Sequence, residues 1–135
     1  MAGSFSNFWE DEVIDHLFMQ GSYTMPTNLW VGYSTADPTD DNSGQAEPTG
    51  VGGYARVSTD GDDWDAASGG ATANAVIIEF PETTASQGII THFCIWDAVT
   101  AGNMVAHGEL DASRALTAAG ITPRFGIGEL GVTLI

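Results

Sequence analysis

Six short apolar segments, separated by clusters of Gly, Asp, Ser and Thr, constrain the fold of this chain more than any other feature. In one of them Val76, Ile78 and Phe80 alternate with their neighbours, and a period of two is typical of a strand with one apolar face. No helical crossovers separate the segments, which favours antiparallel pairing in a mainly β fold, an antiparallel β-sandwich or jelly-roll-like barrel. The predicted strands are Leu29 to Ser34, Tyr54 to Ser58, Asn74 to Phe80, Ile89 to Trp96, Met104 to Leu110 and Phe125 to Leu134.

The N-terminal segment, residues 1–21, is predicted to form the one α-helix. Its apolar side chains recur every four residues, at Phe5, Trp9, Val13 and Leu17. This spacing places them on one helix face, for which packing on the core is favoured over an external interface. Asn7 and Glu10 have capping-box spacing, and Gly21 is expected to end the helix. We expect a single domain over 1–135, with this helix in 1–21 and the β-sandwich or barrel in 28–135.

The strand predicted from Ile89 to Trp96 is apolar on both faces. Ile89, Phe93 and Ile95 point one way, and Ile90, His92, Cys94 and Trp96 the other. Such a strand must be covered on both sides. We expect the core to cover one face, and the N-terminal helix or another subunit to cover the second.

Between the first two predicted strands, within Asn28 to Val57, lies a long acidic loop rich in Asp, Thr, Pro and Gly. The whole stretch contains no His, Cys or Lys, and therefore little of the usual catalytic equipment. We expect the loop to be exposed and presented to a partner.

Charge excludes several classes of partner. The chain has 18 acidic residues, three basic ones and no lysine, and a formal net charge of -15. Because nucleic-acid phosphates and anionic lipids are bound mainly by Lys and Arg, we expect no direct contact with nucleic acid and none with a membrane. The N-terminus resembles no signal peptide, and no apolar run is long enough to span a bilayer. A soluble protein is expected, on the outside of any particle that contains nucleic acid.

Candidate catalytic and metal-binding residues are few. His92 and Cys94 lie two apart on a predicted strand, hence on one face, but zinc needs three or four ligands and only His16 and His107 remain as nitrogen ligands. The sequence has no G-x-S-x-G motif, and no local signature supports a dyad of Cys94 with His107. We expect no catalytic residues, no metal, no cofactor and no enzymatic activity.

Two acidic stretches, Asp37 to Asn42 and Asp60 to Asp65, are weak candidates for binding calcium. They cluster the carboxylates that calcium prefers, but neither follows the spacing of an EF-hand loop. Solvated turns, in which Asp side chains cap loop amides, are favoured.

Several aromatic residues and one arginine are candidates for a protein interface. Arg56, an isolated cation on a predicted strand, is expected to pair with a carboxylate of its own chain or of a neighbouring subunit. Trp64 lies among acids in DDWDAAS and is expected either to fold back onto its sheet or to dock on a partner. The candidate interface residues are Phe5, Trp9, Trp30, Arg56, Trp64 and Trp96.

Four segments, in order, cover more than half of the chain and resemble a family of small tailed-bacteriophage virion proteins. They are AGSFSNFWEDEVIDHLF, LWVGYSTADPTDDNSGQAEP followed by GGYARV, WDAAS, and ITHFCIWDAVTAGNMVAHGEL. The family is that of capsid decoration (cement) proteins, which are often labelled phage tail fibre proteins.

The resemblance implies a non-enzymatic virion protein on the outer capsid surface. It would assemble as a homo-oligomer, a trimer, and would bind the major capsid protein to clamp neighbouring subunits of the shell. The alternative is a tail fibre or receptor-binding component, in which Tyr33, Trp64 and the acidic loops would contact a host glycan or protein.

Overall fold

The chain is built mainly of short strands, and the computed structural model describes residues 1–134. In chain order the elements are β1 (Ala2–Phe5), α1 (Asn7–Leu17), β2 (Leu29–Ser34), β3 (Val57–Thr59), the 3-10 helix η1 (Gly61–Asp63), β4 (Ala71–Ala73), β5 (Ile78–Glu79), β6 (Gly88–Trp96), β7 (Met104–Leu116), β8 (Arg124–Phe125) and β9 (Gly131–Thr133). No helix within these residues has the length and apolarity needed to cross a bilayer.

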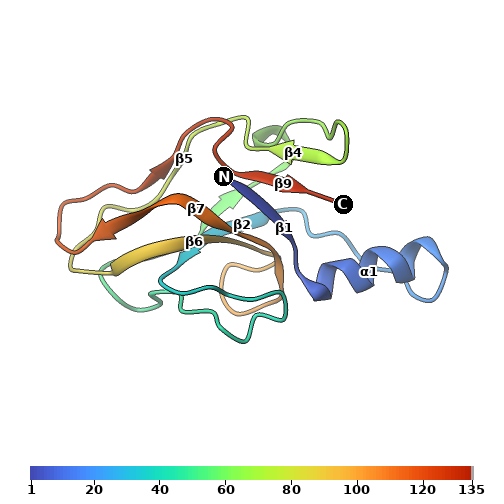
Figure 1. Cartoon of the computed structure of the whole chain (residues 1–135), viewed down its shortest axis with the longest axis horizontal. Helices are drawn as coiled ribbons and strands as arrows, with labels where there is room; N and C mark the ends of the chain where they lie inside the picture. Colours follow the sequence, from blue (N-terminus) through green and yellow to red (C-terminus); the bar gives the residue numbers. More distant parts are fainter. Residues whose placement is uncertain (135) are drawn as a thin grey trace.

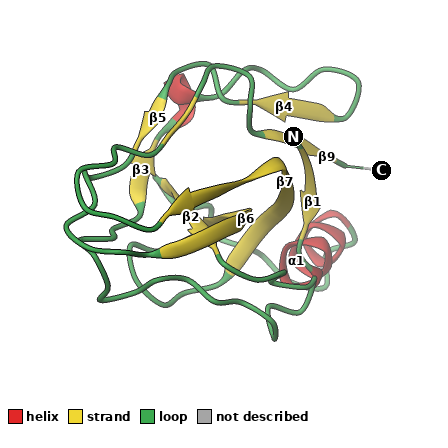
Figure 2. Cartoon of the chain, turned by 60° about the vertical axis from the view of Figure 1, so that its left-hand side comes forward, coloured by secondary structure: helices red, strands yellow, loops and turns green. Residues whose placement is uncertain are grey.

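Seven strands form one sheet that curls around the core (Figures 1 and 2). Their order is β3-β2-β6-β7-β1-β9-β4, and β5 pairs with β8 in a separate small sheet. A bridge between Trp64 and Asn74 joins the segments that follow the two edge strands, β3 and β4. The expected class, a mainly β sandwich or barrel with one helix near the N-terminus, is confirmed. The main core consists of Val31, Tyr33, Ile78, Phe80, Ile90, Phe93, Ile95, Ala106, Leu110, Leu116, Phe125, Leu130 and Val132.

The first residues of the chain form a strand, not the start of the predicted helix. β1 lies between β7, with which it is antiparallel, and β9, with which it is parallel. The expectation of purely antiparallel pairing is therefore wrong for this one pair. Gly3 faces Gly108 across the β1–β7 ladder, and the absence of two side chains leaves room for the Phe93 ring. Phe5 accordingly belongs to a strand and not to the helical stripe.

Helix α1 is shorter than residues 1–21, and other residues than predicted set its ends. Ser6 is the N-cap, and its side-chain oxygen accepts a hydrogen bond from the Trp9 amide at 3.3 Å, so the capping box expected from Asn7 is wrong. At the other end Met19, and not Gly21, has the left-handed conformation that ends the helix, with φ 61°. Ser6 takes the cap because its backbone is extended there, where β1 ends.

Two predicted strands are broken by one buried side chain. Asn74 donates from its side-chain nitrogen to the carbonyl oxygens of Val76 and Gly126, and its oxygen accepts from the Leu130 amide at 2.8 Å. These bonds hold both segments in turns, so the strand predicted from Asn74 to Phe80 shrinks to β5. The strand predicted from Phe125 to Leu134 divides for the same reason into β8 and β9.

A bulge in β6 changes which side chains share a face. The β6–β7 register shifts between Ile90 and His92, so that Ile90 joins Phe93 in the main core while Ile89 is 53% exposed. The predicted grouping of Ile89 with Phe93 is therefore wrong.

The second face of β6 is covered, as expected, but not by the helix. There Cys94 and Trp96 are buried in a second cluster with Met104, and Trp30 packs against it. Helix α1 contacts β7 and β1, and none of its residues is buried.

The Gly3–Gly108 crossing generates a stability prediction. A Cβ on Gly108 would lie 2.5 Å from Cε1 of Phe93 and 2.8 Å from Cα of Gly3. Gly108→Ala should therefore lower the free energy of unfolding by about 1–3 kcal/mol, the usual effect of overpacking a core. Urea unfolding measures this difference. Gly61→Ala is the matched control, because a Cβ there meets no atom within 4 Å, and equal midpoints for the two variants would contradict the packing described.

Candidate attachment site

Arg56 lies in a buried ion pair with Glu47. Its Nε and Nη2 donate to the two carboxylate oxygens of Glu47, each at 2.7 Å, and Nη1 donates to the carbonyl oxygens of Ala98 and Ala101 at 2.8 and 2.9 Å. The guanidinium also stacks over Trp96, 3.9 Å from the ring centroid. Only 6% of the Arg56 side chain and 4% of the Glu47 side chain are exposed. The predicted ion pair is confirmed, and it lies within one chain.

This pair fixes the long acidic loop to the outer face of the sheet. Glu47 belongs to the loop between β2 and β3, and its carboxylate also accepts a hydrogen bond from the Tyr54 hydroxyl. Burial first, and then the Glu47 carboxylate, raise the pKa of Tyr54. Pro38 and Pro48 of the same loop are buried. The expected exposure of the loop is therefore wrong for Pro38, Glu47 and Pro48, and its presentation to a partner stays a prediction.

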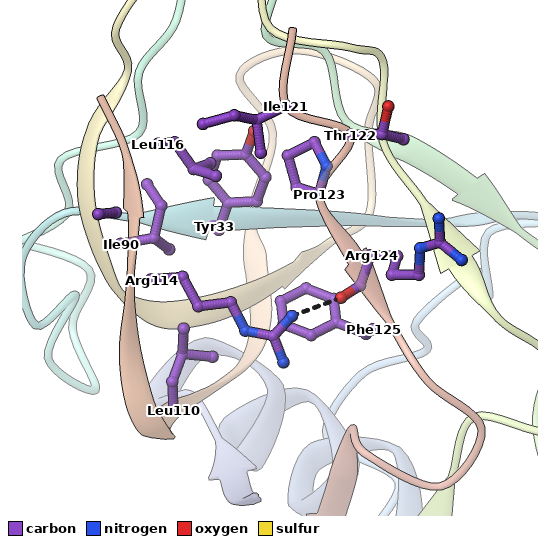
Figure 3. Close-up of a pocket in the computed structure, with 11 residues that line it drawn as sticks. Tyr33, Ile90, Leu110, Arg114, Leu116, Ile121, Thr122, Pro123, Arg124 and Phe125 are labelled. Atoms are coloured by element: carbon purple, nitrogen blue, oxygen red, sulfur yellow. Dashed lines mark hydrogen bonds between the residues drawn. The ribbon is translucent and has the colours of Figure 1, made fainter. Parts of the chain in front are cut away.

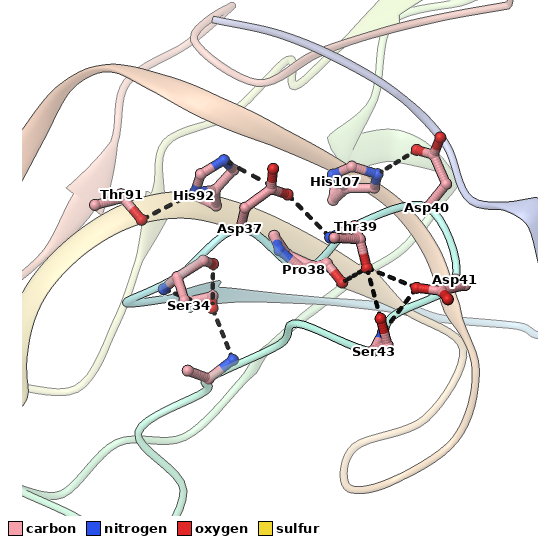
Figure 4. Close-up of polar contacts among 12 residues, drawn as sticks. Ser34, Asp37, Pro38, Thr39, Asp40, Asp41, Ser43, Thr91, His92 and His107 are labelled. Atoms are coloured by element: carbon pink, nitrogen blue, oxygen red, sulfur yellow. Dashed lines mark hydrogen bonds and ion pairs between the residues drawn. The ribbon is translucent and has the colours of Figure 1, made fainter.

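Two histidines of the sheet face carboxylates of the same loop (Figure 4). Nε2 of His107 lies 2.8 Å from Oδ1 of Asp40, and Nε2 of His92 lies 3.8 Å from Oδ1 of Asp37. The Asp40 carbonyl accepts from the amide of Asn7 at 3.0 Å. These contacts join the loop to β6, β7 and the start of α1.

The remaining acid of this loop, Asp41, and Asp60 and Asp63 of the second acidic stretch bind their own turns. The Thr39 hydroxyl and Ser43 donate to Asp41, and these hydrogen bonds lower the pKa of its carboxyl to about 2. In the second acidic stretch Asp60 and Asp63 form a reciprocal capping box around η1. The interpretation of both stretches as Asp-capped turns is confirmed. Within residues 1–134, no three His, Cys, Asp or Glu side chains are grouped as metal ligands.

Cys94 and His107 are direct neighbours across the β6–β7 ladder, which the sequence alone did not reveal. Cys94 is fully buried, and burial raises the pKa of its thiol. A nucleophilic cysteine requires the opposite, an accessible thiol with a lowered pKa. Nε2 of His107 lies 2.8 Å from Oδ1 of Asp40.

Most of the aromatic interface candidates lie in or against the body of the protein. Trp64 donates from Nε1 to the Thr59 hydroxyl at 3.0 Å and packs on the main core, so of its two predicted roles the structure shows the fold-back. Trp96 is buried, and Trp30 and Phe5 are partly buried against the cores. Trp9 lies beside Tyr23, with ring centroids 4.9 Å apart.

A group of exposed apolar side chains lies instead on a projection that includes the helix, whose apolar stripe was expected to pack on the core. We define the α1 projection as residues 7–28, which extend from one end of the body (Figure 1). Five of its apolar side chains are more than half exposed: Ile14, Leu17, Phe18, Met19 and Met25. Trp9, Val13, Leu17, Tyr23 and Met25 line a groove of about 320 Å³ along it. The expectation that the apolar stripe of the helix packs on the core is wrong. The sequence held one indication of this exposure, since Ile14 and Phe18 widen the stripe beyond one helix face.

Exposed apolar side chains gathered on a projection from a folded β body are typical of a protein that binds other proteins. A family model described as podophage GP4 fiber I protein gp80 matches residues 4–133. The chain belongs to this family of phage fibre proteins, and is a structural component of the phage virion. A comparison with curated proteins found no match.

Removing Arg56 should be strongly destabilising. Arg56→Ala would leave the buried Glu47 carboxylate unpaired, so we expect a loss of about 3–5 kcal/mol in the free energy of unfolding, measured in urea. Arg124→Ala is the control, because its pair with Glu79 is 3.8 Å long and more than half exposed, and it should cost at most about 1 kcal/mol. Adding Glu47→Gln to Arg56→Ala should recover part of the lost stability, because it removes the unpaired carboxylate charge. If stability does not recover, that buried charge is not what destabilises Arg56→Ala.

Proposed function

We propose that this virion protein is a capsid decoration protein, which binds the major capsid protein on the outer surface of the shell and stabilises it without catalysis. The observation that carries the proposal is the α1 projection. A set of exposed apolar side chains beside a folded barrel is suited to docking, because their burial on another protein is favourable and their exposure is not.

The charge supports a position on the outside of the particle. With 18 acidic residues against three arginines, the chain is repelled by packaged nucleic acid. The capsid proposal also rests on the four segments that resemble decoration proteins. In it the chain acts as a homo-oligomer, a trimer, and the repeated contacts of many copies around the shell make a modest interface sufficient.

The second candidate is a component of a tail fibre, and the family description favours it, since it names a fibre protein. The version of this candidate in which Tyr33 and Trp64 contact a host receptor does not fit the fold. Tyr33 is 2% exposed, and Trp64 is packed on the core. A fibre role would therefore depend on other surfaces, the α1 projection among them.

Location and copy number in purified particles distinguish the two candidates. If the protein is a decoration protein, electron microscopy should find it over the capsid, and gel densitometry should give copies comparable to those of the major capsid protein. Density on the tail alone, with only a few copies per particle, would overturn the capsid proposal and support the fibre.

Particles assembled without the protein test the stabilising role. We expect them to release their DNA at a lower temperature than complete particles, and adding back the purified protein to restore the difference. Equal release temperatures would contradict a cementing function.

A further inference from the structure

The tip of the α1 projection combines two locally unfavourable features in one residue. Met19 follows the helix cap in the left-handed conformation, and the Gln20 amide donates to the Asp15 carbonyl at 2.9 Å, as in a Schellman motif. Glycine is the residue that suits this position, since it has no side chain to strain the backbone. Met19 is also 88% exposed, next to Leu17 at 70% and Phe18 at 62%. Strained backbone of this kind is often retained for a contact that the side chain makes.

A pocket in the barrel has the size and lining to receive one such side chain (Figure 3). It has a volume of about 220 Å³ and lies between the ends of β6 and β7 and the segment that leads into β8. This is smaller than the usual pocket for a small-molecule ligand. Its apolar lining comes from Ile90, Leu110, Leu116, Ile121 and Phe125.

Two of the three arginines of the chain flank this pocket. Nη1 of Arg114 donates to the Arg124 carbonyl oxygen at 2.7 Å, and the guanidinium lies over the Phe125 ring. Each arginine has one partly exposed carboxylate partner: Arg114 lies 3.4 Å from Glu129, and Arg124 lies 3.8 Å from Glu79. Charge is therefore balanced at the pocket in a chain whose net charge is -15.

The tip, in contrast, follows an acidic helix. Glu10, Asp11, Glu12 and Asp15 precede it, and His16 is the one titratable base of α1. The surface around the Arg-flanked pocket thus repels this helix less than other acidic surfaces of the chain do, and offers cations to its carboxylates.

We propose that the tip, Leu17 to Met19, docks in the Arg-flanked pocket of a second copy of this chain. The α1 projection and the end of the body that holds the pocket lie at opposite ends of the long axis (Figure 1), so a chain does not fill its own pocket. The contact is head to tail, and it continues either to a closed ring or to an open series of copies. It rests on the homo-oligomer in the proposed function, and not on the capsid position.

A mixing experiment on the purified full-length protein tests this contact. The tip variant carries Phe18→Ser and Met19→Gly, and the pocket variant carries Arg114→Glu and Arg124→Glu, which replace both cations beside the pocket with anions. Light scattering after size-exclusion chromatography should give a mass above that of a monomer for the unaltered chain, and association at least about tenfold weaker for each variant alone.

Mixing the two variants should produce a heterodimer of one copy each, because one intact tip then meets one intact pocket and growth stops. Val99→Ser, which removes an apolar side chain that is 52% exposed on a different loop, should leave assembly unchanged. An unaltered chain that stays monomeric at all concentrations, or variants that do not combine, would overturn the proposal. Since the sample contains no capsid, a capsid position could fail while this contact holds.

The single change Met19→Gly separates the contact from folding. It should raise the melting temperature, because glycine relieves the left-handed backbone, and weaken assembly, because the side chain is lost. A fall in both would indicate that Met19 is needed for folding, and would overturn the interpretation of its conformation.

Discussion

The buried pair of Arg56 and Glu47 makes the second face of the central sheet possible. β6 carries apolar side chains on both faces, and the outer one would meet water if the long acidic loop were free. Arg56 stacks on Trp96 and bonds Glu47 in one loop and the carbonyls of Ala98 and Ala101 in another. One cation thus joins both loops over the sheet. A buried pair of this kind is sensitive to the loss of either partner, because the remaining charge has no water around it.

With both faces of β6 covered by loops and core, the barrel leaves no place for α1. Among the strands the helix contacts mainly β7 and β1, and several of its apolar side chains are exposed. In the proposed role the barrel would provide rigidity and the projection the contact surface. The family match places the chain among phage fibre proteins.

Sequence patterns predicted the β class, the helix, the central strands β2, β6 and β7, and the capped acidic turns, because each depends on residues close in the chain. The same patterns did not predict β1, whose place between β7 and β9 depends on Gly3 meeting Gly108 far along the sequence. They also overextended the two strands that the Asn74 side chain interrupts, where a single amide bonds three separate backbone groups. Of the aromatic residues chosen for an interface, Trp96 is buried and three others pack partly buried against the cores, since composition does not distinguish an apolar side chain that packs inward from one that docks outward.

The sequence by itself determined that this is an acidic, β-rich chain of a phage virion family, because charge, period-two alternation and the loop motif are all local properties. Only the tertiary structure decided that the acidic loop covers the sheet, that Arg56 is internal, and that the helix tip and not the tryptophans is exposed. The physical reason is competition for burial. Which of several apolar or charged segments covers the core depends on long-range geometry, such as the distance from Glu47 to Arg56, and not on the pattern of any one segment.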